Sequence, residues 1–315
     1  MNSGVATPSG STPSGGTAVR ALATSKNGRY LYSVQLSGDA TAYSIDATTG
    51  KLTAIDSGTI PAGATPVAIA ADPSNRFAYV LNHDDSTVTP YRIDATTGRL
   101  TANGNAVPTV AQMLSMTIDP TGRNLYVVGS GQLQAFSIDV ESGALNTPVI
   151  DNGNDSVKAL EYVATQVVVE PGGKNLYVVS PDKSIEIYPI DAQTGALGTA
   201  HVQPLDRAAN SLSIDPIGRF LYTADWVRAS VSLFSIDQQN GALVARGQTP
   251  LLGDDPSYVA ADFSGKFLYA ALFLNTDALA TLSIDQTTGS LTFEPSNPSA
   301  GVGTLLDTVT TSDVQ

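Results

Sequence analysis

Two histidines are the first candidates for acid–base chemistry, because the imidazole group titrates near neutral pH. His83 lies in the segment Asn82-His83-Asp84-Asp85, and we consider it as a general base. The alternative for His83 is a solvated loop histidine with no chemical role. His201 is distant from His83 in the repeat pattern described below, so the two histidines do not predict a metal site. The chain contains no cysteine, which excludes disulfides, thiolate catalysis and cysteine-ligated metals.

Two pairs of neighbouring carboxylates, Asp84-Asp85 and Asp254-Asp255, provide oxygen ligands of the kind that calcium prefers. Neither pair belongs to an alternating Asp-x-Asp-x-Asp-Gly loop, which would support such a site. We therefore expect no metal and no cofactor.

The elements that must position these residues come from an internal repeat. Six copies align on a basic residue before an aromatic segment, and subtraction of their numbers gives spacings of 47, 47, 51, 45 and 47 residues. These basic residues are Arg29, Arg76, Arg123, Lys174, Arg219 and Lys266. Each copy carries four short runs rich in Val, Ile, Tyr and Thr, bounded by turn residues, which is typical of strands. Four strands at this period predict an all-β propeller of four-stranded antiparallel blades.

Two columns of acidic residues belong to turns of this repeat and not to a catalytic site. One column is followed four residues later by glycine, and an Asp that accepts backbone N–H bonds before a glycine with positive φ closes a hairpin. Its members are Asp46, Asp94, Asp139, Asp191, Asp237 and Asp285. The other column lies in the first hairpin of each copy and comprises Asp72, Asp119, Glu170, Asp215 and Asp262, with Ser25 in copy one.

Composition limits the partners and the location of the chain. An apolar content of 42% in 315 residues is enough for a large core. The net charge of −13 argues against binding nucleic acid, and no apolar run is long enough to span a membrane. Residues 1–16 have the Ser/Thr/Pro/Gly composition of a flexible linker, and 17–315 are expected to form a single propeller domain. Such a linker favours an extracellular, periplasmic or cell-surface protein after removal of an export signal; a cytoplasmic location is the alternative.

The repeat resembles the lactonase-type β-propeller family, which includes 6-phosphogluconolactonases and carboxymuconate-lactonising enzymes, and also YVTN-type surface-protein repeats. The residues that carry the resemblance are Asp119 to Val127, Tyr79-Val80-Leu81-Asn82, and Tyr43 to Leu52. It covers about residues 17–293 and consists of turn and core positions, so it is specific for fold and not for activity.

The family resemblance implies seven blades, whereas the sequence contains six repeats. Residues 305–312 resemble the first strand of copy one at 19–25, but nothing after them provides the rest of a blade. We favour six blades with an additional terminal strand; a thin seventh blade built from both termini is the alternative.

Positions that break the repeat are the candidates for ligand binding. Arg20, Gln166, Asn210 and Tyr258 are polar or large at the start of the first strand, near the mouth of the channel, where other copies have small or apolar residues. The alternative is that these side chains bond to one another or to channel water. Trp226 and Arg228 occupy a loop and would suit stacking on a sugar or an anionic ring. The longest connection, 149–163, adds Asp151, Asn154, Asp155, Lys158, Glu161 and Tyr162.

Two classes of function remain open, and whether the chain is an enzyme is uncertain. The resemblance implies a lactonase that opens a sugar-acid lactone, with His83 or Glu161 as base and Arg20, Arg207 or Arg228 holding the developing oxyanion. The histidine-bearing first strands of enzymatic relatives are missing, so we expect instead an exported, non-enzymatic binding or scaffold module for a small molecule, a carbohydrate or a protein. A third possibility is an assembly that pairs chains through a terminal strand.

Overall fold

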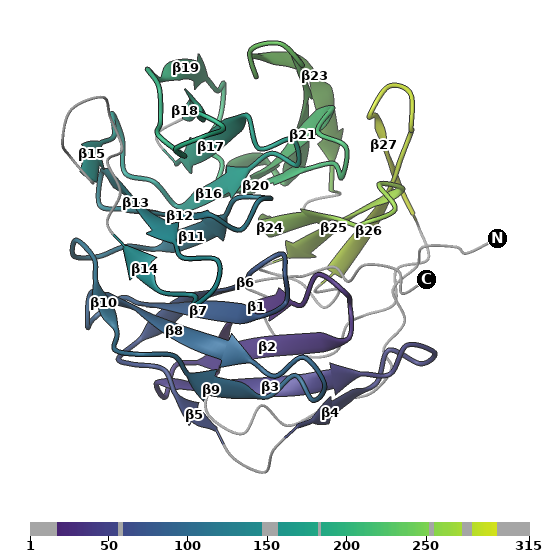
Figure 1. Cartoon of the computed structure of the whole chain (residues 1–315). Coiled ribbons are helices and arrows are strands. Elements are labelled where there is room, and N and C mark those ends of the chain that lie inside the picture. Colours follow the sequence, from purple (N-terminus) through teal and green to yellow (C-terminus); the bar gives the residue numbers. More distant parts are fainter. Residues whose placement is uncertain are drawn as a thin grey trace.

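The computed structural model describes residues 18–55, 59–146, 157–181, 184–251, 255–272 and 279–294, which form six antiparallel sheets. Figure 1 shows these sheets following one another in sequence order around a ring, as the blades of a β-propeller. The predicted fold class is therefore confirmed. The predicted linker 1–16, the terminal segment 305–312 and the candidates Asp151, Asn154, Asp155 and Asp254 lie outside the described residues.

Each blade corresponds to one copy of the sequence repeat. Blade 1 comprises β1 (Val19–Thr24), β2 (Tyr30–Gln35), β3 (Asp39–Ile45), β4 (Leu52–Ala54) and β5 (Ile60–Pro61). Blade 2 comprises β6 (Pro66–Ala71), β7 (Phe77–Asn82), β8 (Thr87–Ile93), β9 (Leu100–Ala102) and β10 (Val107–Pro108). Blade 3 comprises β11 (Ser115–Ile118), β12 (Asn124–Gly129), β13 (Gln132–Ile138), β14 (Leu145–Asn146) and β15 (Val157–Ala159).

In the last three blades the fourth strand contains one named strand, although in blade 4 an isolated bridge between Ile190 and Leu197 precedes it. Blade 4 comprises β16 (Gln166–Val169), β17 (Asn175–Ser180), β18 (Ser184–Pro189) and β19 (His201–Pro204). Blade 5 comprises β20 (Ser211–Ile214), β21 (Phe220–Asp225), the short 3₁₀-helix η1 (Trp226–Arg228), β22 (Ser230–Ile236) and β23 (Leu243–Pro250). Blade 6 comprises β24 (Pro256–Ala261), β25 (Phe267–Leu272), β26 (Leu279–Ile284) and β27 (Leu291–Phe293).

The first strand of each blade is innermost, because β1, β6, β11, β16, β20 and β24 contact one another in that order. In blades 1 to 3 the fourth strand is interrupted, and both of its parts pair with the third strand, as β4 and β5 do with β3. Among the residues that the structure describes, no helix is long and apolar enough to cross a membrane.

The core lies between neighbouring blades and is filled by the second strands. A tyrosine of the second strand is completely buried in blades 1 to 5, at Tyr32, Tyr79, Tyr126, Tyr177 and Tyr222. Four of these tyrosines donate a hydrogen bond to the glycine carbonyl of a turn in the next blade, for example Tyr126 to Gly195 O at 2.8 Å. The hydroxyl of Tyr32 is buried without a partner, and the bond from blade 1 to a turn of blade 2 is made by Tyr30, whose hydroxyl donates to Thr96 O at 2.7 Å.

The acidic columns are turn residues, as the sequence predicts. Asp94 Oδ1 accepts hydrogen bonds from the N–H groups of Thr96 and Thr97 at 3.0 and 2.8 Å, and Gly98 has a φ of 74°. In the first hairpin of blade 2, Asp72 Oδ1 accepts bonds from the N–H groups of Arg76 and Phe77. These carboxylates close hairpins and are occupied by backbone donors.

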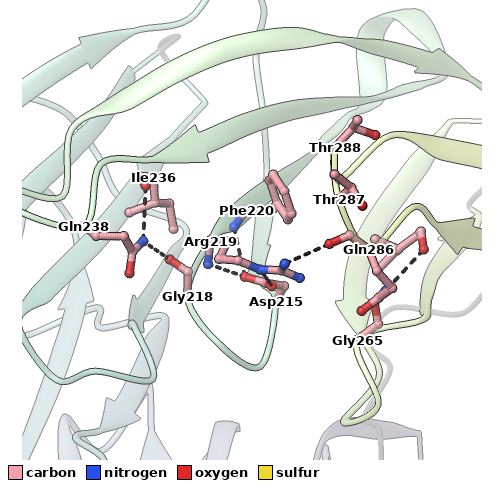
Figure 2. A network of polar contacts seen from close by, with 12 residues as sticks. Asp215, Gly218, Arg219, Phe220, Ile236, Gln238, Gly265, Gln286, Thr287 and Thr288 are labelled. Carbon is pink, nitrogen blue, oxygen red and sulfur yellow. Dashed lines mark hydrogen bonds and ion pairs between the residues drawn. The ribbon is translucent and has the colours of Figure 1, made fainter.

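Two of the aligned basic residues, Arg76 and Arg219, bond to the next blade on the same side as these turns. Figure 2 shows the case between blades 5 and 6, where Arg219 Nη1 donates to Gln286 O at 2.7 Å. Arg219 Nε lies 3.3 Å from Oδ2 of the buried Asp215. The side chain of Gln286 donates to Gly265 O and Ile284 O of its own blade. This network is structural and does not form a site.

Candidate functional site

The opposite side of the ring carries the residues that break the repeat. In an antiparallel meander the start of the first strand and the turn between the second and third strands lie at the same end, together with the inter-blade connections. We call this end the connection face; it is formed by the inter-blade connections, such as 205–210, and by the turns after the second strands, such as 226–229. Every described candidate from the sequence, except His201, lies on or beside this face.

Gln166 and Tyr258 meet across the innermost strands. Gln166 Nε2 donates to the Tyr258 hydroxyl at 3.2 Å, and Gln166 Oε1 accepts from Leu212 N at 2.7 Å. Asn210 is adjacent, since its carbonyl accepts from Thr165 Oγ1 at 3.0 Å. The Gln166 amide thus connects blades 4, 5 and 6. For Gln166 and Tyr258, this bond is of the kind expected if the channel-mouth side chains bond to one another and not to a ligand.

The other predicted candidates stand apart from this cluster. Arg20 is exposed at the start of β1, and the side chain of Glu161 is exposed while its N–H donates to Glu186 Oε1 at 3.1 Å. His83 Nδ1 lies 2.7 Å from Asp84 Oδ1, so a carboxylate orients its ring. The contacts found among the described residues do not bring Arg20, His83 and Glu161 together.

The carboxylates Asp84 and Asp85 are occupied by their own loop. Asp84 Oδ2 accepts from the Thr65 hydroxyl at 2.6 Å, and Asp85 Oδ2 accepts from Ala64 N at 2.7 Å. No group of three or more potential metal ligands occurs within the part of the chain that the structure describes.

A column of positions at the ends of the second strands reveals a residue that the repeat analysis does not single out. The register aligns Gln35, Asn82, Gly129, Ser180, Asp225 and Leu272. Asp225 is the only ionisable member and is 2% exposed. Its Oδ1 accepts from Thr223 Oγ1 at 3.0 Å, and its Oδ2 accepts from Ser232 Oγ. An alignment of this column in the sequence would have shown the acid, but not its burial.

Arg207 is the cationic group whose charge acts on Asp225. Arg207 lies in the connection that leads into blade 5, and its side chain is partly exposed, although its Nε is buried without a hydrogen-bond partner. Burial raises the pKa of the Asp225 carboxyl, while the hydroxyls of Ser232 and Thr223 and the charge of Arg207 act in the opposite direction. Arg207 therefore has a buried N–H group without an acceptor and acts on the Asp225 carboxylate through its charge, and Asp225 is followed in the chain by the exposed Trp226 and Arg228.

A second buried acid near this face is Glu186 of β18 in blade 4, which is not the equivalent of Asp225. Its Oε1 accepts from Glu161 N, and its Oε2 accepts from the Tyr188 hydroxyl at 2.5 Å. Lys158 Nζ lies 5.1 Å from the centroid of the Tyr188 ring. Oε1 of Glu186 therefore anchors the long connection between blades 3 and 4, and its Oε2 is occupied by Tyr188 of the same strand, so we assign Glu186 a structural role.

Comparison with known proteins identifies the class. The sequence model of the family described as "Lactonase, 7-bladed beta-propeller" matches residues 60–152 and 205–307, which is more than half of the chain. The chain belongs to this lactonase family of β-propellers.

Particular relatives carry more specific names. A 6-phosphogluconolactonase of Pectobacterium carotovorum is 29% identical over 188 residues, covering 56% of this chain and 54% of the relative. A 6-phosphogluconolactonase of Xenorhabdus nematophila is 31% identical over 111 residues, covering 35% of this chain and 31% of the relative. Thus the match to the first of these relatives spans only about half of its length.

Solved structures support the fold at lower sequence identity. A Bacteroides fragilis protein provisionally named a 6-phosphogluconolactonase superposes with a TM-score of 0.76 at 20% identity, over 90% of this chain and 84% of that one. The periplasmic gluconolactonase of Pseudomonas aeruginosa gives a TM-score of 0.73 at 16% identity, over 87% of this chain and 84% of that one.

These findings correct the expectation of a non-enzymatic binding or scaffold module. That expectation depended on the missing histidine-bearing first strands and on the regularity of the repeat. The relatives that match in sequence are named as 6-phosphogluconolactonases, which favours the lactonase alternative. The repeated residues form the turns and core of the propeller and do not determine activity. The regularity of the repeat was therefore no evidence against an enzyme.

Proposed function

We propose that this chain hydrolyses a sugar-acid lactone, as a 6-phosphogluconolactonase-like enzyme. The observation that carries the proposal is the Arg207 guanidinium, whose Nε is buried without a partner and whose charge acts on the buried Asp225 carboxylate. Membership of the lactonase family and the names of the relatives support the same reaction class.

Lactone hydrolysis adds water to the ester carbonyl carbon and breaks the bond from that carbon to the ring oxygen. Negative charge develops on the carbonyl oxygen in the tetrahedral intermediate, and a fixed cation that donates hydrogen bonds stabilises it. Arg207 supplies that cation, and the Asp225 carboxylate acts on it only through its charge, since the oxygens of Asp225 accept their hydrogen bonds from Thr223, Ser230 and Ser232. A charged pair of this kind is more effective where burial limits screening by water.

Two groups remain candidates for the base that takes a proton from the attacking water. His83 is oriented by Asp84, as an imidazole base requires, and Glu161 is exposed beside the connection into blade 4. Trp226 and Arg228 are exposed directly after Asp225, where they would contact the sugar-acid portion of a substrate.

The test is a pH-stat assay of the full chain on 6-phosphogluconolactone and on the unphosphorylated gluconolactone. We expect acid release well above the spontaneous rate for at least one of them. Rates equal to those of buffer on both lactones, from protein that unfolds cooperatively, would refute the proposal.

We also propose that the protein is exported, because residues 1–16 have linker composition. Fractionation of the native producing cells, followed by detection of the chain, tests this location; recovery only from the cytoplasm would reject it.

A further inference from the structure

Three asparagine–glycine pairs lie in the described part of the chain, and their surroundings differ. They are Asn27-Gly28, Asn103-Gly104 and Asn240-Gly241. Asparagine is a thermolabile residue. When glycine follows it, the glycine nitrogen can attack the side-chain amide carbon, because the glycine has no side chain of its own to obstruct the approach. Which pair can react therefore depends on whether its glycine nitrogen is free and has room.

Two of the pairs are protected by their turns. Gly28 and Gly241 are buried, and their nitrogens are occupied. Gly28 N donates to Ser25 O at 2.9 Å, and Gly241 N donates to Asp237 O at 2.8 Å. A Cβ built on Gly241 would lie 2.5 Å from Asn175 Cγ of the preceding blade, so no room remains at Gly241 for a new ring.

The pair Asn103-Gly104 lies in a different setting, between β9 and β10 at the outer edge of blade 2. Gly104 is exposed, and a Cβ built on it would meet no atom within 4 Å. Its nitrogen makes no hydrogen bond to any residue that the structure describes. The pair also breaks the repeat, because Ile55 and Glu294 occupy the place of Asn103 in blades 1 and 6. Gly104 thus has both the free nitrogen and the space that the other two glycines lack.

The side chain of Asn103 connects two blades. Its Nδ2 donates to Ser142 O at 2.7 Å, in the turn of blade 3 that ends at Gly143. An aspartate at this position would have no hydrogen to donate at neutral pH, and its negative charge would face a carbonyl oxygen. Loss of the amide would therefore remove a contact between blades 2 and 3.

We propose that Asn103 is a deamidation site, at which Gly104 N closes a cyclic imide on Asn103 Cγ. The bond from Gly104 N to Cγ forms, the bond from Cγ to Nδ2 breaks, and Nδ2 leaves as ammonia with the proton of Gly104 N. Water then opens the imide at one of its two carbonyl carbons. Opening at the backbone carbon gives isoaspartate, whose main chain runs through Cβ and Cγ, and opening at Cγ gives aspartate. Water is the only reactant that the step consumes.

Peptide mapping by mass spectrometry tests the site on the full chain, kept folded in mildly alkaline buffer. We expect Asn103 to convert about fivefold or more faster than Asn27 and Asn240, the factor by which one intact hydrogen bond suppresses an open state. Conversion at Asn27 or Asn240 as fast as at Asn103 would overturn the proposal. Labelling with an isoaspartyl methyltransferase and its methyl donor should mark the peptide that contains Asn103. Formation of aspartate alone at this position would overturn the imide route.

Two variants test the consequence for the boundary between blades 2 and 3. Asn103→Asp should lower the denaturation midpoint, because it removes the donor to Ser142 O. Asn105→Asp adds the same charge at an exposed position of the same loop and is the matched control, which should leave the midpoint unchanged. Equal midpoints for the two variants would overturn the inference that deamidation loosens this boundary. Because no lactone is involved, the results are independent of the proposed reaction.

Discussion

The buried carboxylate of Asp225 lies in the electrostatic field of the Arg207 guanidinium, although the two residues are 18 positions apart in the sequence. The connection into blade 5 supplies the cation, and the end of β21 supplies the acid. The carboxylate oxygens of Asp225 are occupied, because they accept hydrogen bonds from the hydroxyls of Thr223, Ser230 and Ser232. Arg207 Nε has no acceptor, so the arginine is the group that can donate a hydrogen bond to a ligand.

Replacement of Arg207 should remove transition-state stabilisation. We expect Arg207→Ala to lower kcat on the lactone substrate by about 10²–10³-fold, the usual loss for one oxyanion donor. Arg207→Lys should restore part of the activity, because it keeps the charge without the fork of donors. Arg246→Ala, at an exposed position on β23, is the control; an equal loss in that variant would point to misfolding.

Replacement of Asp225 should separate activity from stability. Because burial raises its pKa, folding favours the protonated form, and this contribution to stability is lost as pH rises through the folded pKa. Asp225→Asn should therefore gain stability relative to the native chain as pH rises above about 4, while activity falls. Denaturation midpoints of the variant and the native chain, measured between pH 4 and pH 8, test this expectation. If the stability of the variant relative to the native chain fell as pH rose, the expected direction would be wrong. Asp206→Asn, exposed in the same connection, is the control.

The turn aspartates should make the propeller sensitive to acid. Hydrogen bonds from the N–H and hydroxyl of Thr97 lower the pKa of Asp94, and similar bonds lower the pKa values of Asp46, Asp139, Asp191 and Asp285. A lowered folded pKa contributes stability above the unfolded pKa, which is lost as pH falls through the folded pKa. We expect the melting temperature to fall below about pH 4. The double variant Asp94→Asn/Asp285→Asn should show a smaller acid-induced fall.

Two buried tyrosines form a matched pair for the inter-blade hydrogen bond. Tyr126→Phe removes the bond to Gly195 O and should cost about 1 kcal/mol. Tyr32→Phe removes a buried hydroxyl that has no partner, and should be neutral or stabilising. Chemical denaturation compares the two variants. Equal losses would mean that the ring environment, and not the hydrogen bond, determines the effect.

The contacts of Arg219 with Asp215 and Gln286, drawn in Figure 2, should affect the stability of the fold and not its activity. Arg219→Ala removes the donor to Gln286 O and leaves the buried Asp215 without its cation, at a cost of about 1–3 kcal/mol. Lactonase activity at a temperature well below the melting transition should remain unchanged, since Arg219 lies on the opposite side of the ring from Arg207.

The sequence was sufficient for the propeller because its evidence is local. The turn at Asp94 and Gly98 and the aromatic strand around Tyr79 can each be recognised in every copy from a few neighbouring residues. The site was harder to predict, because Gln166 looked like a ligand-binding break in the repeat but hydrogen-bonds Tyr258 and Leu212 N. Asp225 was passed over because its burial, and its proximity to Arg207, depend on how two separate segments pack.

Trp226 extends the exposed end of β21 and is the single tryptophan of the chain. It is 47% exposed and directly follows Asp225, so its indole is an intrinsic optical probe located at the candidate site. Emission excited selectively at the red edge of indole absorption reports on that one side chain. A lactone or sugar acid that displaces water from the ring should shift the emission to the blue, which gives a label-free binding titration even for variants that no longer turn over.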